Sequence, residues 1–288
     1  MNDTQYQTIS VEPLSTSVGA IVGGVDIATG ASREQFAEIQ RAFVEHSVIF
    51  FRDQSLTPDQ HIAFAERWGE INVNRFFQPV ATHPNIAEVR KDAEQKINVG
   101  GSWHTDHSYD QTPAMGSLLY AREVPPIGGD TLFSSMYAAY DALSDGMKNL
   151  LLGLRAVHSS RHAFGYEAYD GVDMDDIDNR YQNMHDATQD AVHPVVISHP
   201  LSGRPALYVN SNFTVKFEGW TPQESQPLLD FLYAHAQRNE FTCRFKWEAG
   251  SMAIWDNRAT HHCALNDYHG ERRLMHRITI EGEALSAA

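Results

Sequence analysis

The stretch GSWHTDHSYD at residues 101–110 concentrates side chains that could bind a metal ion. His104 and Asp106 stand two positions apart, so in an extended chain both side chains point to the same side. An imidazole and a carboxylate on one face could be two ligands of a metal site that still lacks a third ligand. They could equally be an ordinary surface ion pair. We expect His107, directly behind them, to lie near such a site or at the surface rather than to be a ligand.

A third ligand from a distant segment would complete a known arrangement. Two histidines and one carboxylate on one face of a metal leave the opposite positions open, which is the ligand set of non-haem Fe(II) oxygenases. The segment 254–277 offers four histidines, and periodicity alone does not select among them: His261, His262, His269 and His276. Because neighbouring residues of a strand face opposite ways, only one member of the HH pair is expected to be a ligand.

Composition argues against several other classes of function. The 288 residues are 42% hydrophobic and 20% charged, as in globular proteins, and their formal net charge is -15. This charge argues against nucleic acid and against an anionic membrane surface as partners. The sequence has no apolar run long enough for a transmembrane helix, no signal-peptide pattern at its start and two cysteines that suggest no disulfide framework. We therefore expect a cytoplasmic protein.

Patterns along the chain predict a mainly β protein with flanking helices. Apolar residues at helical spacing predict a helix over 33–46, and the capping sequences TPDQ and TPQE predict helices that begin near Pro58 and Pro222. A buried strand is expected at 47–51. Further short strands are expected at 115–121, 193–200, 205–210, 241–247, 251–256 and 273–282. Many short strands with few helices favour a β-sandwich or barrel core.

The segment 166–186 differs from the rest of the chain because it is acidic and poor in aliphatic residues. The spacing of its acidic residues does not match an EF-hand loop. We therefore interpret the residues around 165–190 as a mobile excursion or a lid over a site. The whole chain, 1–288, is expected to form one domain.

Several blocks, in order along the chain, resemble the TauD/TfdA family of Fe(II)- and 2-oxoglutarate-dependent dioxygenases. The resemblance runs from about residue 8 to residue 283 and includes SVIFFRDQSLTPDQHIAFAERWGEI, WHTD, PPIGGDTLFSSMYAAYDALS and WDNRATHH…ERRLMHR. It implies a double-stranded β-helix, or jelly-roll, core. It also implies hydroxylation of a substrate C–H bond, coupled to conversion of 2-oxoglutarate and O₂ into succinate and CO₂.

The resemblance further implies roles for individual residues. His104, Asp106 and His262 match the iron ligands of the family. Thr131 of GGDT and Arg273 match the pair that binds the distal carboxylate of 2-oxoglutarate. Without the resemblance, GGDT would be interpreted as a turn, because glycine permits a positive φ.

Arg277 matches a second arginine of the family, which serves the 2-oxoglutarate carboxylate near the metal and the anionic end of the substrate. Four residues apart on a strand, Arg273 and Arg277 share a face, which fits a joint pocket. Arg272 should face away from them and be solvated. Arginine suits both roles because its planar fork matches the geometry of a carboxylate.

The residues expected around the substrate depart from the taurine-oxidising branch of the family. Where that branch has a histidine, a tyrosine and an asparagine, this chain has Asn74, Phe77 and Gly100. Aromatic residues are kept as Phe164 and Phe213. Fewer polar contacts beside a retained arginine predict a small anion with a larger apolar or aromatic body, such as an aryloxyalkanoate, an alkyl sulfate or a sulfonate.

Two other classes of function stay open at this point. A metal-dependent hydrolase could use the same three ligands with Zn²⁺, although the paired arginines and GGDT favour a 2-oxoacid. A non-catalytic protein that binds a 2-oxoacid on the same fold is the second alternative, and the intact ligand set argues against it. In each case we expect a small anionic molecule as the partner and a homo-oligomeric protein.

Overall fold

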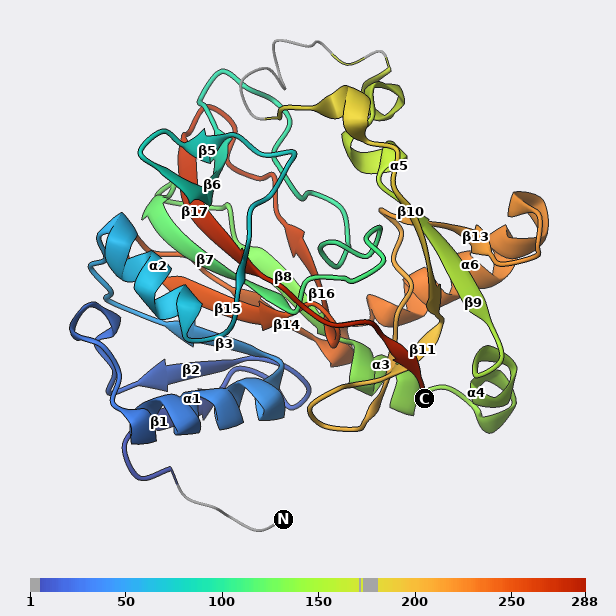
Figure 1. Ribbon diagram of the computed structural model, residues 1–288, viewed down its shortest axis with the longest axis horizontal. Coiled ribbons are helices and arrows are strands. Elements are labelled where there is room, and N and C mark those ends of the chain that lie inside the picture. The colour runs from blue at the N-terminus through green and yellow to red at the C-terminus, as the bar shows by residue number, and fades with distance from the viewer. Residues whose placement is uncertain (1–5, 171, 173–180) are drawn as a thin grey trace.

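The computed structural model, which describes residues 6–170, 172 and 181–288, contains layered β-sheets with helices on the outside (Figure 1). The larger sheet has nine strands, in the order β1-β2-β3-β15-β7-β17-β6-β5, with β4 beside β17. A second sheet, in the order β14-β8-β16, packs against its inner face. Two more three-stranded sheets have the orders β10-β9-β13 and β12-β11-β18. This mainly β architecture with flanking helices agrees with the predicted jelly-roll core.

The bounds of the elements are as follows. The larger sheet contains β1 (Ser10–Pro13), β2 (Ala20–Gly23), β3 (Val48–Phe51), β4 (Ile71–Asn72), β5 (Pro79–Val80), β6 (His83–Lys91), β7 (Gly116–Glu123), β15 (Met252–Asp256) and β17 (Arg273–Ile280). The other sheets contain β8 (Thr131–Ser135), β9 (Arg155–Ser159), β10 (Asp190–Pro194), β11 (Val196–Ser198), β12 (Pro205–Leu207), β13 (Thr214–Phe217), β14 (Thr242–Phe245), β16 (Thr260–Ala264) and β18 (Ser286–Ala287). The helices are α1 (Arg33–His46), α2 (Pro58–Glu66), α3 (Met136–Asp141), α4 (Asp145–Leu151), α5 (Arg161–Phe164) and α6 (Pro222–Ala236).

The helices begin where their capping sequences predict. The side chain of Thr57 accepts a hydrogen bond from the backbone N–H of Gln60, and Thr221 does the same for Glu224, so both predicted capping boxes are confirmed. None of the helices in the described part of the chain is long and apolar enough to cross a membrane.

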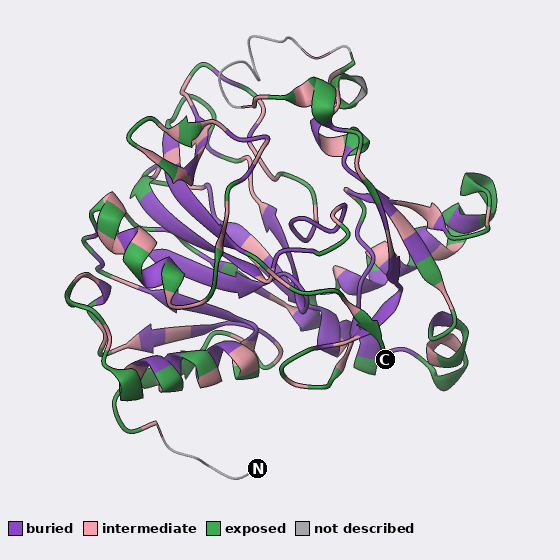
Figure 2. Cartoon of the chain, viewed as in Figure 1, coloured by how far each residue is buried: buried purple, intermediate pink, exposed green. Residues whose placement is uncertain are grey.

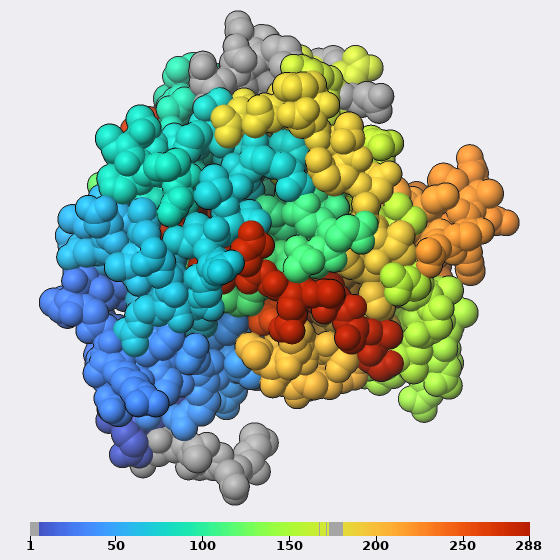
Figure 3. Space-filling model, in the orientation of Figure 1, coloured from blue at the N-terminus to red at the C-terminus, as the bar shows by residue number. Residues whose placement is uncertain are grey.

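One predicted strand, 193–200, is two strands, so that prediction was wrong. The chain changes sheets at Val195, whose N–H donates to Leu154 O and whose carbonyl accepts from Tyr208 N. Pro194, which ends β10, has no N–H to donate to a ladder. The second strand, β11, pairs with β12 and with the C-terminal strand β18. The end of the chain therefore lies on the surface of the molecule that faces the viewer in Figure 3.

The middle strands of the larger sheet are buried on both faces, which explains the continuous apolar run at 48–51 (Figure 2). Val48 and Phe50 pack in the core between the sheets, whereas Ile49 and Phe51 pack in the core beneath α1 and α2. Strand β17 divides in the same way: Arg273, Met275 and Arg277 lie on its inner face, whereas Ile278 and Ile280 pack in the core beneath the helices. Because strand side chains alternate, a slip of one residue would turn both arginines toward the helices.

Two buried histidines lie on the helix-covered side of the sheet. His61 of α2 is 1% exposed, and burial, with the charges of His276 and Arg122, lowers its pKa to about 3. Burial, with the charges of Arg122 and His83, lowers the pKa of His276 to about 4. Both imidazoles are therefore neutral in the folded protein near neutral pH.

Because the folded protein holds His61 in its neutral form, we expect its stability to fall in acid. The substitution His61→Leu should reduce this loss. The folded-state pKa of His61 lies below its unfolded value, so between the two values only the unfolded chain binds the proton and stability falls as the pH falls. From about pH 7.5 to about pH 5 the wild-type protein should lose about 2 kcal/mol more than the variant, at about 1.4 kcal/mol per pH unit. Urea unfolding at the two pH values measures this difference, and equal losses in both proteins would contradict it.

Candidate active site

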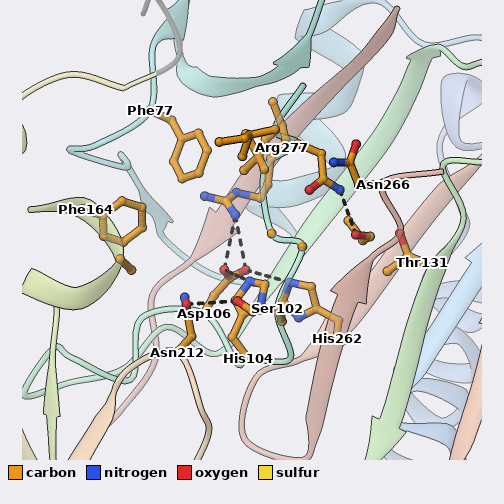
Figure 4. Close-up of a pocket in the computed structure, with 18 of the residues that line it drawn as sticks. Phe77, Ser102, His104, Asp106, Thr131, Phe164, Asn212, His262, Asn266 and Arg277 are labelled. Atoms are coloured by element: carbon orange, nitrogen blue, oxygen red, sulfur yellow. Dashed lines mark hydrogen bonds and ion pairs between the residues drawn. The ribbon is translucent and has the colours of Figure 1, made fainter. Parts of the chain in front are cut away.

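A cavity of ≈ 480 Å³ lies between the larger sheet and the β14-β8-β16 sheet, and ten of the eleven predicted site residues line it (Figure 4). The ten are Phe77, Gly100, His104, Asp106, Thr131, Phe164, Phe213, His262, Arg273 and Arg277. The cavity therefore brings together residues that are far apart in the sequence.

Three side chains converge at one end of the cavity. The candidate ligand atoms of His104, Asp106 and His262 all lie within 4.8 Å of one another, and all three residues are buried. Nε2 of His104 lies 3.7 Å from Oδ1 of Asp106, and Nε2 of His262 lies 4.0 Å from Oδ2. These separations are too long for direct hydrogen bonds and match donors that share a single cation.

Backbone pairing holds the two histidines together. His104 and His262 form an isolated antiparallel bridge, in which each N–H donates to the other residue's carbonyl, at 3.1 and 2.8 Å. The chain is extended at His104, as expected, but it turns from Asp106 onward, and His107 has a φ of 60°. Ring Nδ1 of His104 lies 2.7 Å from Ser102 O, so Nδ1 carries the proton and Nε2 offers its lone pair to the cavity.

The electrostatics of the three residues fit a divalent cation. Burial lowers the pKa of His104 and lowers that of His262 further, so both imidazoles are neutral. Burial alone would raise the pKa of Asp106, but the charge of Arg277 holds it well below its usual range. Two neutral imidazoles and one ionised carboxylate are the donor set that Fe(II) oxygenases use.

The structure distinguishes the two histidines of the HH pair. His262 faces the cavity, whereas His261 does not line it and is 3% exposed in the interior behind β16. Burial and the charge of His104 lower the pKa of His261 to about 3. The alternation of side chains on β16 thus leaves one histidine for the cluster, as the sequence argument requires.

A second group of residues forms an anion pocket beside the cluster. Arg273 is 5% exposed, and its Nε and Nη2 have no hydrogen-bond partner among the described residues, while burial lowers the pKa of its guanidinium. Oγ1 of Thr131 accepts a hydrogen bond of 2.9 Å from Trp247 Nε1, so its own O–H is available to donate. A buried guanidinium with unused donors beside a free hydroxyl is suited to a carboxylate.

Glycine explains the close approach of the GGDT turn to this pocket. Gly129 has a φ of 71°, and its N–H donates to Oδ1 of Asp267. A Cβ at this position would lie 3.4 Å from Cδ of Arg273 and 3.1 Å from Pro125. The turn therefore leaves room for the arginine while it brings Thr131 into the cavity.

Arg277 lies between the cluster and the aromatic part of the cavity. Its Nη1 donates to Oδ1 of Asp106 at 3.3 Å, and its guanidinium carbon lies 4.4 Å from the centre of the Phe77 ring. Nε of Arg277 has no hydrogen-bond partner in the part of the chain that the structure describes. Arg272, in contrast, is half exposed and pairs with Asp92 and Glu123, as a solvated neighbour should.

Aromatic rings form the wall of the cavity on the side away from Thr131 (Figure 4). Phe164 stacks on Phe76 with ring centres 4.4 Å apart and lies 6.1 Å from Phe213.

Gly100 has a φ of 75°, and a Cβ there would come within 3.3 Å of Cε1 of His104. Glycine therefore lets the backbone pass close to the imidazole of a cluster residue.

Asn74 does not occupy the position expected for a substrate contact. It is not among the described residues that line the cavity, and its side chain is 8% exposed as part of a buried network. Its Oδ1 accepts from the N–H groups of Phe76 and Phe77, and its Nδ2 lies 3.1 Å from Nε2 of His107. Three of the four hydrogen bonds that its amide can make are therefore taken by protein groups, and the structure does not place Asn74 in the cavity with the other predicted residues.

Several cavity residues were not predicted from the sequence. Ser102, Tyr169, Tyr181 and Asn212 line the cavity, and Trp247 supports Thr131 from behind. Tyr169 and Tyr181 lie within the segment 165–190 that we interpret as a mobile excursion or a lid, of which residues 171 and 173–180 lie outside the described residues. The alternation of FTCRFKW could have pointed to Trp247, since Cys243, Phe245 and Trp247 share one face.

Comparison with known proteins assigns this arrangement to a family. The model of the taurine catabolism dioxygenase TauD, TfdA family matches residues 10–279. The chain belongs to the TauD/TfdA family. A sulfate ester dioxygenase of Pseudomonas putida that depends on alpha-ketoglutarate is 34% identical, over 96% of this chain and 90% of that protein. The alpha-ketoglutarate-dependent 2,4-dichlorophenoxyacetate dioxygenase of Cupriavidus pinatubonensis is 32% identical, over 96% and 99%.

Crystal structures of TauD/TfdA-type proteins have the same fold. A taurine dioxygenase from Burkholderia xenovorans is 34% identical and superposes with a TM-score of 0.82, over 97% of this chain and 93% of that one. The structure of AAD-2 in complex with Mn(II) and N-oxalylglycine has a TM-score of 0.80 and 29% identity, over 97% and 100%. The jelly-roll fold predicted for this chain is thereby confirmed.

The cluster predicts which substitutions abolish metal binding in this family member. Alanine at His104, Asp106 or His262 should weaken Mn(II) binding by more than the roughly 10–100-fold that loss of an outer partner costs. His261→Ala should weaken Mn(II) binding by no more than roughly 10–100-fold. Titration of Mn(II) followed by its EPR signal measures this, and normal binding by His262→Ala would show that the cluster is misassigned.

The anion pocket predicts a graded loss of 2-oxoglutarate affinity. Arg273→Ala should cost about 2–5 kcal/mol, because the variant leaves a buried carboxylate unpaired, which raises the KM about 30-fold or more. Thr131→Val should cost about 1–3 kcal/mol for a lost hydrogen bond to a charged group. Arg272→Ala is the matched control and should leave the KM unchanged, whereas an unchanged KM in Arg273→Ala would remove Arg273 from this role.

Proposed function

We propose that this TauD/TfdA family member is an Fe(II)- and 2-oxoglutarate-dependent dioxygenase that hydroxylates a small organic monoanion with an apolar or aromatic body. The observation that carries the proposal is the position of Arg277. Its guanidinium lies between the carboxylate of Asp106, at 3.3 Å, and the ring of Phe77, at 4.4 Å. An anion held there would place its apolar body against the aromatic wall, beside the cluster.

The reaction consumes one substrate, one 2-oxoglutarate and one O₂, and it yields hydroxylated substrate, succinate and CO₂. The two oxygen atoms of O₂ enter the hydroxyl group and succinate. When bound, the ferrous ion would supply the binding and reduction of O₂ that the protein's own side chains cannot perform. The protein side chains position both substrates and exclude water.

Each group of residues has one task in this proposal. His104, Asp106 and His262 hold the metal ion. Arg273 and the hydroxyl of Thr131 bind the distal carboxylate of 2-oxoglutarate, with Trp247 fixing the orientation of the threonine. Arg277 binds the anionic end of the substrate and serves the 2-oxoglutarate carboxylate near the metal.

The aromatic wall favours an apolar substrate body over a second charged group. Phe77, Phe164, Phe213, Tyr169 and Tyr181 line this side of the cavity. An ammonium group, as in taurine, would lose hydration there without meeting a carboxylate other than Asp106 among the described lining residues. Sulfate ester and aryloxyacetate dioxygenases among the relatives agree with an apolar body joined to an anion.

Family membership disfavours both alternative functions. The curated relatives are named as dioxygenases rather than as Zn²⁺ hydrolases or binding proteins, apart from an alkylsulfatase of Acinetobacter baylyi that is 30% identical. The three residues of the metal cluster are also intact. A single domain, a homo-oligomeric state and a cytoplasmic location stay predictions.

Substrate preference provides the test. Succinate formation should be measured with hexyl sulfate, 2-phenoxypropanoate and taurine, with controls that lack Fe(II) or substrate. Hydroxylation at the carbon that bears oxygen gives a hemiacetal-type product, which breaks down to hexanal and sulfate, or to phenol and pyruvate. We expect kcat/KM for the better of these two substrates to exceed that for taurine by about tenfold or more, since an unpaired charge rejects a ligand strongly. If taurine prevails, the substrate class is wrong; no turnover with any anion would overturn the activity.

A further inference from the structure

The amide of Asn74 has a single orientation that its partners determine. Its Oδ1 accepts two backbone hydrogen bonds, from Phe76 N at 2.9 Å and from Phe77 N at 3.1 Å. Since these donors require the oxygen, the NH₂ group must face His107. Nε2 of His107, 3.1 Å from Nδ2 of Asn74, therefore accepts a hydrogen bond and carries no proton.

His107 passes this constraint on to the next residue of the network. With Nε2 as the acceptor, Nδ1 of His107 donates to Oδ2 of Asp110 at 2.8 Å. The other carboxylate oxygen of Asp110 accepts from Arg75, the neighbour of Asn74. The hydrogen bonds thus form a closed loop between the turn that follows Asp106 and the segment 74–77.

This hydrogen-bond network reaches the proposed substrate site through Phe77. Phe77, whose N–H is held by Asn74, is 4% exposed, and its ring lies under the guanidinium of Arg277. Arg277 in turn contacts Asp106, the residue before His107. The hydrogen-bond network and Arg277 therefore both connect the segment 74–77 with the turn that begins at Asp106.

The segment 74–77 also positions part of the aromatic wall. Phe77 forms an isolated antiparallel bridge with Tyr181, and Gln182 N donates to Phe76 O at 2.8 Å. The side chain of Asn183 donates to Arg75 O at 2.9 Å. Residues 181–183 are thereby attached to the backbone that Asn74 holds, and the ring of Tyr181 lies 5.2 Å from that of Phe77.

We propose that Asn74, His107 and Asp110 form a clamp that positions Phe77 and Tyr181, and so sets the affinity for the substrate without touching it. The clamp acts on one half of the cavity. Arg273 and Thr131, on the other half, stand on the strands β17 and β8. This inference rests on the proposed function, because it assigns the Phe77 side of the cavity to the substrate.

The kinetic test compares Asn74→Ala with a matched control. Gln54 is also 8% exposed, and its amide also makes three hydrogen bonds, to Ile27 N, Val25 O and Arg52 O, on the side of the larger sheet away from the cavity. Asn74→Ala should raise the KM for the best substrate of the panel about tenfold, while the KM for 2-oxoglutarate stays within about twofold. Gln54→Ala should lower the melting temperature similarly and change neither KM.

A thermodynamic cycle tests the route through Phe77. Because Asn74 acts on the substrate through Phe77, the effects of Asn74→Ala and Phe77→Ala on the substrate KM should not add in the double variant. Additive effects, or an Asn74→Ala protein that loses stability but keeps the substrate KM, would overturn the clamp and leave Asn74 a structural residue.

Hydrogen exchange tests the clamp without any substrate. In Asn74→Ala the amides of Phe76, Phe77 and Gln182 should exchange about tenfold faster or more, whereas those of the His104–His262 bridge should not change. Gln54→Ala should leave all of them unchanged. Unaltered exchange at Gln182 in Asn74→Ala would overturn the clamp. If the wild-type protein turns over no anion, the proposed function fails, and the exchange result still decides whether the clamp exists.

Discussion

A buried carboxylate, that of Asp106, is the constraint on which the site depends. Taking a charge out of water costs several kcal/mol unless it is paired and hydrogen-bonded. Arg277 lies 3.3 Å from it and Ser117 donates to it at 3.2 Å, while the two nearby imidazoles are neutral. The protein alone therefore has one full positive charge beside Asp106, and that charge belongs to the residue proposed to bind the substrate.

The net charge of the whole cavity also favours a monoanionic substrate. Among the described lining residues, apart from histidines, Asp106, Arg273 and Arg277 carry charge. A divalent cation would bring the excess to three positive charges, which the dianion of 2-oxoglutarate and a monoanionic substrate would neutralise. A zwitterion would leave one charge uncompensated in a buried space, so the charge balance and the aromatic wall favour the same class of substrate.

Sequence patterns predicted the elements well where one physical signal dominates. Apolar spacing and capping boxes located α1, α2 and α6, and alternation placed Arg273 and Arg277 on one face of β17. The side chain of Asn74 could not be predicted, because its direction depends on N–H groups of its own loop and on His107, a residue of another segment. Pro194 could have indicated the end of β10, but the change of sheet at Val195 depends on two distant partners, Leu154 beside β9 and Tyr208 beside β12.

Most residues proposed for the chemistry that the family shares stand on strands, whereas those proposed to contact the substrate body lie mostly outside the long strands. Thr131, His262, Arg273 and Arg277 stand on strands whose register fixes them, which suits chemistry that is common to the family. The aromatic wall comes from the 74–77 segment, α5 and the residues around 181 and 213, which lie outside the long strands. Loops tolerate substitution better than paired strands do. A change of substrate therefore needs changes in the loops and in the hydrogen bonds that hold them, while the sheets and the cluster can stay as they are.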